Sequence, residues 1–242
     1  MKRLLPLIGL LTATTFAAPA KSAPECVVLL HGVLQSGLSM ELIESALARD
    51  GYRVLNVSYP SRRLNVEQIA RDFLPKQLAK AGITDAPRMH FVCHSMGSLV
   101  ARTFLRDSPP ANLGRVVMLG PPNHGSAAAD KLANNEFFRW AVGVNLDNLR
   151  TTPDALAQKL PPADYELGII AGETSINPLF RKSVGGKADG PVSLESARLE
   201  GMTDFLVVKH SHTLMLWQSD VIAQVVAFVR NGKFDRPAPK RK

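Results

Sequence analysis

The stretch "FVCHSMGSLV", residues 91–100, places one serine between a β-like apolar run and a helix-like one, with small residues on both sides. A strand, a serine and a helix in this order are typical of a sharp turn that lifts the hydroxyl clear of the backbone. The C-x-S-x-G spacing around Ser95 is close to the G-x-S-x-G pattern of nucleophilic serines, with Cys93 in place of the first glycine. The structural alternative is that Ser95 only caps a helix.

Short β-branched runs alternate with longer segments of helical period on both sides of this stretch. Alternation of this kind predicts an α/β fold, a mostly parallel sheet of about six strands with helices on both faces. The predicted strands are 26–32, 52–59, 89–95, 115–120, 166–172 and 204–210. The predicted helices are 40–49, 65–81, 96–107 and 220–230. The second helix should begin with an Asn65/Gln68 capping box and bend at Pro75.

The chain divides into a leader, one domain and a tail. Residues 1–20 have a basic start, an apolar stretch and a small-residue end, the pattern of a signal peptide, so we expect export to the periplasm or secretion. Residues 21–235 form the predicted domain. Within it, residues 123–164 separate two strands by far more than an ordinary connection and are too apolar for a linker. We expect them to form a small cap; an ordinary extra helix on the sheet is the alternative.

Charge and cysteine content limit the partners of the protein. The whole chain is formally +8, and +6 without Lys2 and Arg3. Part of this charge lies in residues 236–242, which we expect to be a flexible basic tail; weak contact with an anionic envelope surface is the alternative. Basic and aromatic residues do not interleave, so nucleic acid is not an expected partner, and we expect a monomer. Cys26 and Cys93 should lie at opposite ends of neighbouring strands and therefore stay unpaired.

A nucleophilic serine needs a histidine that accepts its proton and an acid that orients the histidine. His212 begins the loop after the last predicted strand, whereas His210 still belongs to that strand, so His212 is the predicted base. For the acid we expect Asp189, which stands in a D-G turn after the fifth strand, with Glu173 as its rival. We expect no metal site, because His90 and His94 have the spacing of a helix face but lie on a predicted strand, and His210 and His212 have no third ligand in register.

Stabilising an oxyanion takes backbone N–H donors near the serine. Met96 directly follows the serine, and the loop after the first strand supplies Val33, with Leu34 as its possible replacement.

Taken in order, "LLHGV", "CHSMGS", "LGPPNHGS", "ADGPVSLES" and "HSHTLM" make the chain similar to the α/β-hydrolase superfamily, specifically its small exported bacterial lipases and esterases. The resemblance implies an α/β-hydrolase fold, a triad of Ser95, Asp189 and His212, and oxyanion donors at Val33 and Met96. It also implies that Asn123 and His124 shape the pocket; Leu34 and His94 are further candidates for substrate contact. Because the predicted mature chain starts almost directly at the first strand, we expect it to differ from larger relatives in having no hairpin before that strand.

The expected activity is hydrolysis of a small-molecule or lipid carboxylic ester through an acyl-serine, without a cofactor. Two alternatives remain open at this point. An acyltransferase would use the same triad, and a catalytically inactive lipid-binding relative would keep only the fold.

Overall fold

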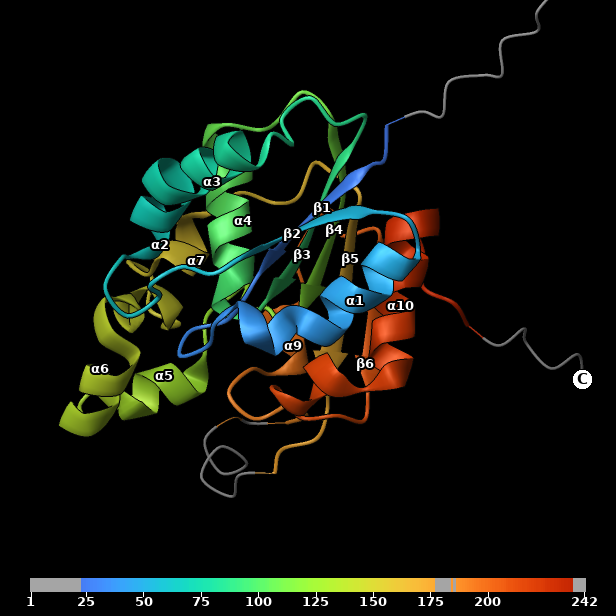
Figure 1. The fold of residues 1–242 in the computed structure, drawn as a ribbon. Coiled ribbons are helices and arrows are strands. Elements are labelled where there is room, and N and C mark those ends of the chain that lie inside the picture. The colour runs from blue at the N-terminus through green and yellow to red at the C-terminus, as the bar shows by residue number, and fades with distance from the viewer. Residues whose placement is uncertain (1–22, 177–183, 185, 237–242) are drawn as a thin grey trace, which may run out of the picture.

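The computed structural model describes residues 23–176, 184 and 186–236 of the 242-residue chain. The predicted signal peptide, residues 1–20, lies outside the described residues, as do residues 237–242 of the predicted tail. In the described part, one parallel sheet lies between two layers of helices, as predicted (Figure 1).

All six predicted strands are present, with bounds that differ from the prediction by up to two residues at either end. They are β1 (Cys26–Leu30), β2 (Arg53–Val57), β3 (Met89–His94), β4 (Leu113–Leu119), β5 (Leu167–Gly172) and β6 (Asp204–Val208). Their order is β2-β1-β3-β4-β5-β6, and every neighbouring pair is parallel. The strand order reverses between β1 and β3, so a crevice is expected where these two strands end.

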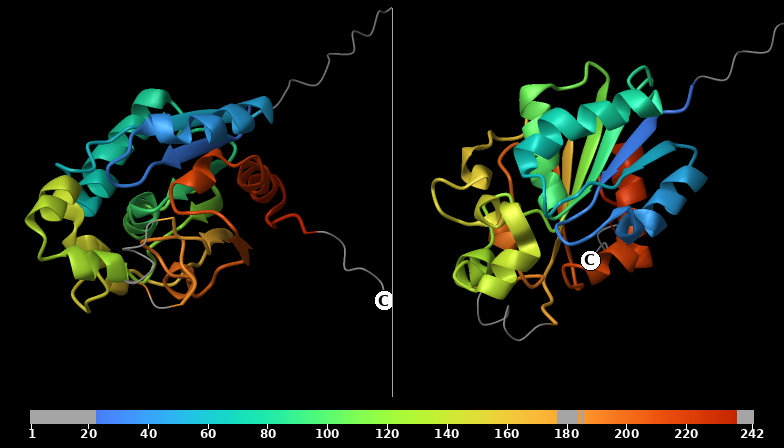
Figure 2. Two further views of the ribbon diagram at one scale, coloured as in Figure 1. Left: turned by 90° about the horizontal axis from the view of Figure 1, so that it is seen from below. Right: turned by 60° about the vertical axis from the view of Figure 1, so that its left-hand side comes forward.

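The two faces of the sheet carry separate cores. Helices α1 (Glu41–Arg49) and α10 (Ser219–Asn231) cover one face, and α2 (Val66–Gln68), α3 (Leu74–Ala81) and α4 (Met96–Asp107) cover the other (Figures 1 and 2). Because both faces are buried, β1, β3 and β5 are buried along their whole length. Helix α10 ends at Gly232 in the left-handed conformation, as the Asn-Gly pair predicts.

The helix expected at 65–81 begins with the predicted capping box between Asn65 and Gln68. Its middle is a π-helical turn, Ile69–Phe73, which joins α2 to α3. Pro75 lies in the first turn of α3 and has no N–H to give to an α-helical bond. The irregularity expected at the proline is therefore a widened turn just before it.

Residues 123–164, the predicted cap segment, form several short helices: α5 (Ala127–Leu132), α6 (Glu136–Val142), η3 (Gly143–Asn145), η4 (Asp147–Leu149) and α7 (Leu156–Lys159). Figure 1 shows α5 and α6 at the lower left, beyond the carboxyl ends of the strands. In the second part of the segment, Leu156, Leu160 and Ala163 are buried in the same core cluster as residues of α4. Val142 and Leu146 of the first part belong to this cluster as well, so both parts of the segment pack on the core.

Two smaller expectations can be compared with the structure, those on the cysteines and on the basic tail. Both cysteines are free and buried, Cys26 beside Met89 and Cys93 beside Leu30, at opposite ends of the strand pair. The boundary of the basic tail is wrong by one residue. Arg236 belongs to the folded part, because its guanidinium binds Asp204 with nitrogen–oxygen distances of 2.6 and 2.9 Å.

The elements not yet named are short: η1 (Gly37–Met40) before α1, α9 (Leu194–Ala197) after the Asp189 loop, and η5 (Leu214–Trp217) before α10. The first and the last follow β1 and β6 and lead into α1 and α10, whereas α9 lies between β5 and β6.

Candidate active site

Ser95 occupies the turn between β3 and α4 in a conformation that few non-glycine residues adopt. Its φ is 53° and its ψ is −124°. The backbone N–H of Ser95 donates to the carbonyl of Leu119 at 2.9 Å, which holds the turn against β4. Gly97 allows α4 to approach β1, because a Cβ at this position would press against the carbonyl oxygen of Leu30. Cys93, the departure from the first glycine, is accommodated as a fully buried core residue.

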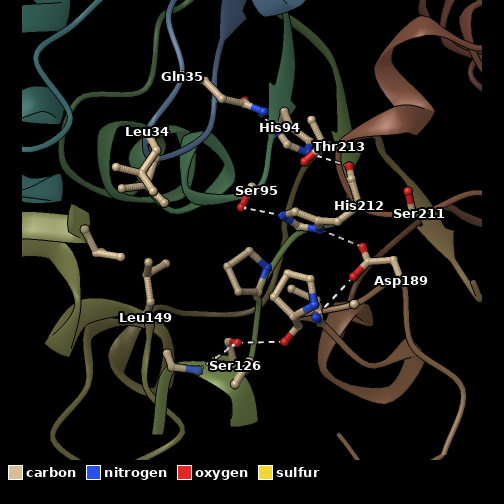
Figure 3. A pocket seen from close by; sticks show the side chains of 18 of the residues that line it. Leu34, Gln35, His94, Ser95, Ser126, Leu149, Asp189, Ser211, His212 and Thr213 are labelled. Carbon is tan, nitrogen blue, oxygen red and sulfur yellow. Dashed lines mark hydrogen bonds and ion pairs between the residues drawn. The ribbon is translucent and has the colours of Figure 1, made fainter. Parts of the chain in front are cut away.

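The imidazole of His212 lies between Ser95 and Asp189. Its Nε2 is 2.9 Å from the Ser95 hydroxyl oxygen and its Nδ1 is 2.7 Å from Asp189 Oδ2 (Figure 3). With Nδ1 protonated and donating to the carboxylate, Nε2 is free to accept the serine proton. The three predicted side chains therefore meet, although 94 and 23 positions of sequence separate them. This arrangement can activate a serine hydroxyl as a nucleophile.

Asp189 is held by the turn that begins with it. Its Oδ1 accepts from Val192 N at 3.1 Å, and its own N–H donates to the Val192 carbonyl at 3.1 Å. The remaining carboxylate oxygen faces His212, whose backbone N–H also donates to the Asp189 carbonyl at 3.0 Å. The carboxyl is 2% exposed. Burial and these three hydrogen bonds thus fix both Asp189 and His212.

Gly120, at the end of β4, makes room for this pair. A Cβ there would lie 2.8 Å from Asp189 Oδ2 and 2.9 Å from His212 Nδ1. Its φ of 53° is also a left-handed value. The position therefore requires glycine on both grounds.

Neither rival residue joins the site. Glu173 binds Lys187, with 2.6 Å between Oε2 and Nζ, and this hydrogen bond lowers the pKa of the Glu173 carboxyl. His210 binds the carboxylate of Asp220, with 2.9 and 3.1 Å between Nε2 and the two oxygens. The geometry accordingly supports Asp189 and His212 in the two roles.

The predicted oxyanion residues come from two elements beside Ser95. Met96 is the first residue of α4, and Val33 and Leu34 form the turn after β1 that lines the same cavity. Gly32 packs against the turn at Ser95, which we call the elbow, because a Cβ on Gly32 would lie 3.1 Å from the Cβ of Ser95. Leu34 has a φ of 62°, the other positive value at a non-glycine residue among those described. Both turns that should supply the amides therefore have unusual backbones.

A cavity of about 390 Å³ opens at Ser95. The cap segment contributes an apolar wall, and Asp189 is the only carboxylate among the described residues that line the cavity. The sequence shows that the cap segment is apolar but not which of its residues form this wall. The residues that form it are Ala128, Ala129, Phe138, Val142, Leu146 and Leu149.

The residues predicted to touch substrate are not all in the cavity. Leu34 lines it and is 54% exposed. His94 also borders it, but the ring is 1% exposed and both of its nitrogens face protein oxygens. The positions of Asn123 and His124 differ from the prediction, because neither is among the residues that line the cavity.

Asn123 is fully buried and donates to the Ala197 carbonyl at 2.9 Å, while His124 faces solvent. Their neighbours Pro122 and Ser126 line the cavity instead. Ser126 caps α5 through the Ala129 N–H and donates to the Pro191 carbonyl at 2.7 Å, so it joins the cap to the Asp189 loop.

Within the described residues, no three histidine, cysteine, aspartate or glutamate side chains are grouped so that they could hold a metal ion. No helix in that part of the chain has the length and apolar character needed to cross a membrane.

Comparison with known proteins identifies the family and the fold of the chain. The model of the alpha/beta hydrolase family matches residues 27–230. The fold is similar to the mature lipase BlEst2 of Bacillus licheniformis, with a TM-score of 0.64, 18% identity, and 82% of this chain and 89% of that chain covered. It is also similar to a thermophilic esterase of Thermogutta terrifontis, with a TM-score of 0.60, 14% identity, and coverage of 90% and 97%.

Phospholipase PlaB of Legionella pneumophila is a further similar structure, with a TM-score of 0.60, 21% identity and 72% of this chain covered; the chain spans only 44% of that structure. No curated protein sequence matches the chain.

Proposed function

The chain belongs to the alpha/beta hydrolase family, and on that premise we propose that it is a serine hydrolase that cleaves carboxylic esters. The observation that carries the proposal is the contact chain from the Ser95 hydroxyl through the His212 imidazole to the Asp189 carboxylate, with distances of 2.9 and 2.7 Å. The lipase and the esterase with similar folds give it secondary support.

The proposed reaction has two halves. Ser95 Oγ attacks the ester carbonyl while His212 Nε2 takes the hydroxyl proton, and the oxyanion that forms accepts hydrogen bonds from the amides of Val33 and Met96. His212 then gives the proton to the leaving alcohol, whose bond to the carbonyl carbon breaks. Water attacks the acyl-serine while His212 Nε2 takes its proton. His212 then returns this proton to Ser95 Oγ as the bond from Oγ to the acyl carbon breaks and the acid is released. No step uses a cofactor.

The cavity supports an apolar acyl group as the part of the substrate that it holds. Its wall from the cap segment is made of aliphatic and aromatic side chains, and burying each methylene there contributes about 0.8 kcal/mol. Export and action on envelope or extracellular esters remain part of the proposal, on the basis of residues 1–20 alone.

The proposal is tested with p-nitrophenyl esters of increasing acyl length, measured on the wild type and on Ser95→Ala. We expect the wild type to hydrolyse them and Ser95→Ala to lose at least about 10³-fold in kcat. Added alcohol should leave the free acid as the main product; an ester of that alcohol as the main product would instead identify an acyltransferase. A correctly folded wild type that hydrolyses no ester, or an active Ser95→Ala, would overturn the proposal.

A further inference from the structure

His94 is a buried polar side chain that the triad does not use. It is the last residue of β3, directly before Ser95, and is 1% exposed. Its Nε2 lies 3.0 Å from the backbone oxygen of His212, and its Nδ1 lies 2.9 Å from Gln35 Oε1 (Figure 3). The rings of His94 and His212 are 4.8 Å apart between centroids. One side chain on a central strand thus touches two loops that each belong to the site.

On the first side, Gln35 connects His94 to the turn that carries Val33. Gln35 Oε1 accepts from the Gly32 N–H at 3.0 Å and packs beside His94 Nδ1. Gly32 has no room for a side chain, since a Cβ would lie 2.9 Å from both Gln35 Oε1 and His94 Nδ1. The backbone just before the proposed oxyanion amide is therefore packed directly on the His94 ring.

On the second side, His94 holds the backbone of the proposed base. The His212 N–H donates to the Asp189 carbonyl at 3.0 Å, and the His212 carbonyl faces His94 Nε2. A carbonyl oxygen only accepts, so this contact is a bond when Nε2 carries the hydrogen. Asp189 fixes the His212 ring and N–H, while His94 is the group placed to fix its carbonyl.

We propose that His94 is a positioning residue for the reaction at Ser95: its Nε2–H donates to the His212 carbonyl, and the other side of its ring packs against Gln35 and Gly32, so the ring couples the turn after β1 to the loop of the base. This inference rests on the proposed function of Ser95. A shift of about 1 Å at a reacting group can cost about 10²-fold in rate, so a residue that only holds a loop can matter to kcat.

The two contacts of His94 can be separated by substitution. Burial and the neighbouring His212 lower the pKa of His94 well below its usual value, so the ring is neutral near pH 7. A neutral imidazole donates through one nitrogen at a time. Glutamine places an amide donor where Nε2 stands, and asparagine places one where Nδ1 stands. Phenylalanine keeps the ring volume and removes both.

We expect His94→Phe to lower kcat by about 10- to 100-fold on a p-nitrophenyl ester, with KM changed by less than about 3-fold. His94→Gln should recover kcat to within about 5-fold of the wild type, whereas His94→Asn should resemble His94→Phe. Gln35→Met should lower kcat in the same direction by a smaller factor.

His90→Phe is the matched control. His90 is equally buried on the same strand, but it contacts Glu25 Oε2 at 3.0 Å and the Arg115 N–H at 2.9 Å, away from the site. Its loss should lower thermal stability and leave kcat within about 2-fold of the wild type. A fall in kcat equal to that of His94→Phe would overturn the inference, as would rescue by asparagine in place of glutamine.

Amide hydrogen exchange supplies a readout that needs no activity. In His94→Phe the amides of Gly32 and His212 should exchange about 10-fold faster than in the wild type, and in His90→Phe they should not. Unchanged exchange at both amides would overturn the inference even if kcat fell. If the wild type hydrolysed no ester, the proposed function would fail, while the exchange rates would still test whether His94 holds the loops of Gly32 and His212.

Discussion

At the scale of single residues, the site depends on Ser95 being held in a conformation that costs about 1–3 kcal/mol. The surrounding structure offsets this cost through the bond from Ser95 N–H to Leu119 and the close seat of Gly97 on β1. In return the hydroxyl projects from the backbone toward His212 with 8% of the residue exposed.

The sequence was enough to predict the role of a site residue where a short local motif fixes the direction of its side chain. The elbow around Ser95 and the D-G turn at Asp189 are of that kind, since each is decided within five residues. Asn123 and His124 are not. The resemblance of the run "PPNHGS" implies that both lie in the pocket, but Asn123 points into the core and His124 outward, and only their tertiary partners decide these directions.

The identity of the acid gives a sharp test at this scale. Asp189→Asn keeps the shape of the turn but removes the negative charge that orients and stabilises the protonated His212, so kcat should fall by about 10²- to 10⁴-fold. Glu173→Gln removes only the ion pair with Lys187 and should change kcat by less than about 3-fold. Steady-state kinetics on one ester decide between them, and the opposite ranking would make Glu173 the acid.

At the scale of elements, both ends of the cap segment bind to α4, the helix that directly follows Ser95. Arg102 on α4 is 3% exposed, and its guanidinium donates to Asn123 at the start of the segment and to Leu160 and Pro161 near its end, at 3.0 to 3.2 Å. Burial lowers the pKa of Arg102 to about 10. A buried cation that binds carbonyl oxygens at both ends acts as a clasp for the insertion.

A second clasp lies midway along the cap segment. Asn145 is fully buried, donates to the carbonyls of Ser61 and Leu64 at 2.7 and 2.8 Å, and accepts from Val66 N at 2.9 Å. Neither clasp could be predicted from the sequence. Arginine and asparagine are mostly exposed in proteins, so Arg102 and Asn145 would be predicted at the surface unless their distant carbonyl partners were known.

Removing the guanidinium should destabilise the protein at Arg102, where it is buried, and not at an exposed arginine of the same helix. Arg102→Met leaves buried carbonyls without a donor and should lower the free energy of unfolding by about 1.5–3 kcal/mol. Because the cap wall then loosens, hydrolysis of long-chain esters should fall more than that of short-chain esters.

Arg106→Met on the same helix is the control for that experiment, since the Arg106 guanidinium binds the adjacent Asp107 at the surface. It should change the free energy of unfolding by less than about 0.5 kcal/mol. Chemical denaturation measures both variants, and equal losses would show that Arg102 is not a clasp.

At the scale of the whole molecule, the strand order explains why three distant segments meet. All six strands are parallel, so the loops after β1, β3, β5 and β6 all lie at the carboxyl edge of the sheet. The strand order reverses between β1 and β3. The turn after β1, Ser95, Asp189 and His212 follow those four strands in turn. The alternation of strand and helix in the sequence was enough to predict this edge, and the family match over residues 27–230 agrees with it.

The shape of the cavity is a property of the whole fold that the sequence did not reveal. Its walls combine the cap segment with Ile176, Val192 and Leu214 from loops after β5 and β6. Such a surface arises from several segments packing at once, and no periodicity within one of them encodes it.

The most direct measurement of the central claim is the rate at which a fluorophosphonate probe labels the protein, with the labelled residue located by mass spectrometry. The account predicts a single adduct on Ser95 in the wild type. It predicts labelling at least about 10²-fold slower in His212→Ala and within about 3-fold of the wild type in His210→Ala. An unlabelled Ser95 in folded protein, or a rate that falls in His210→Ala but not in His212→Ala, would contradict it.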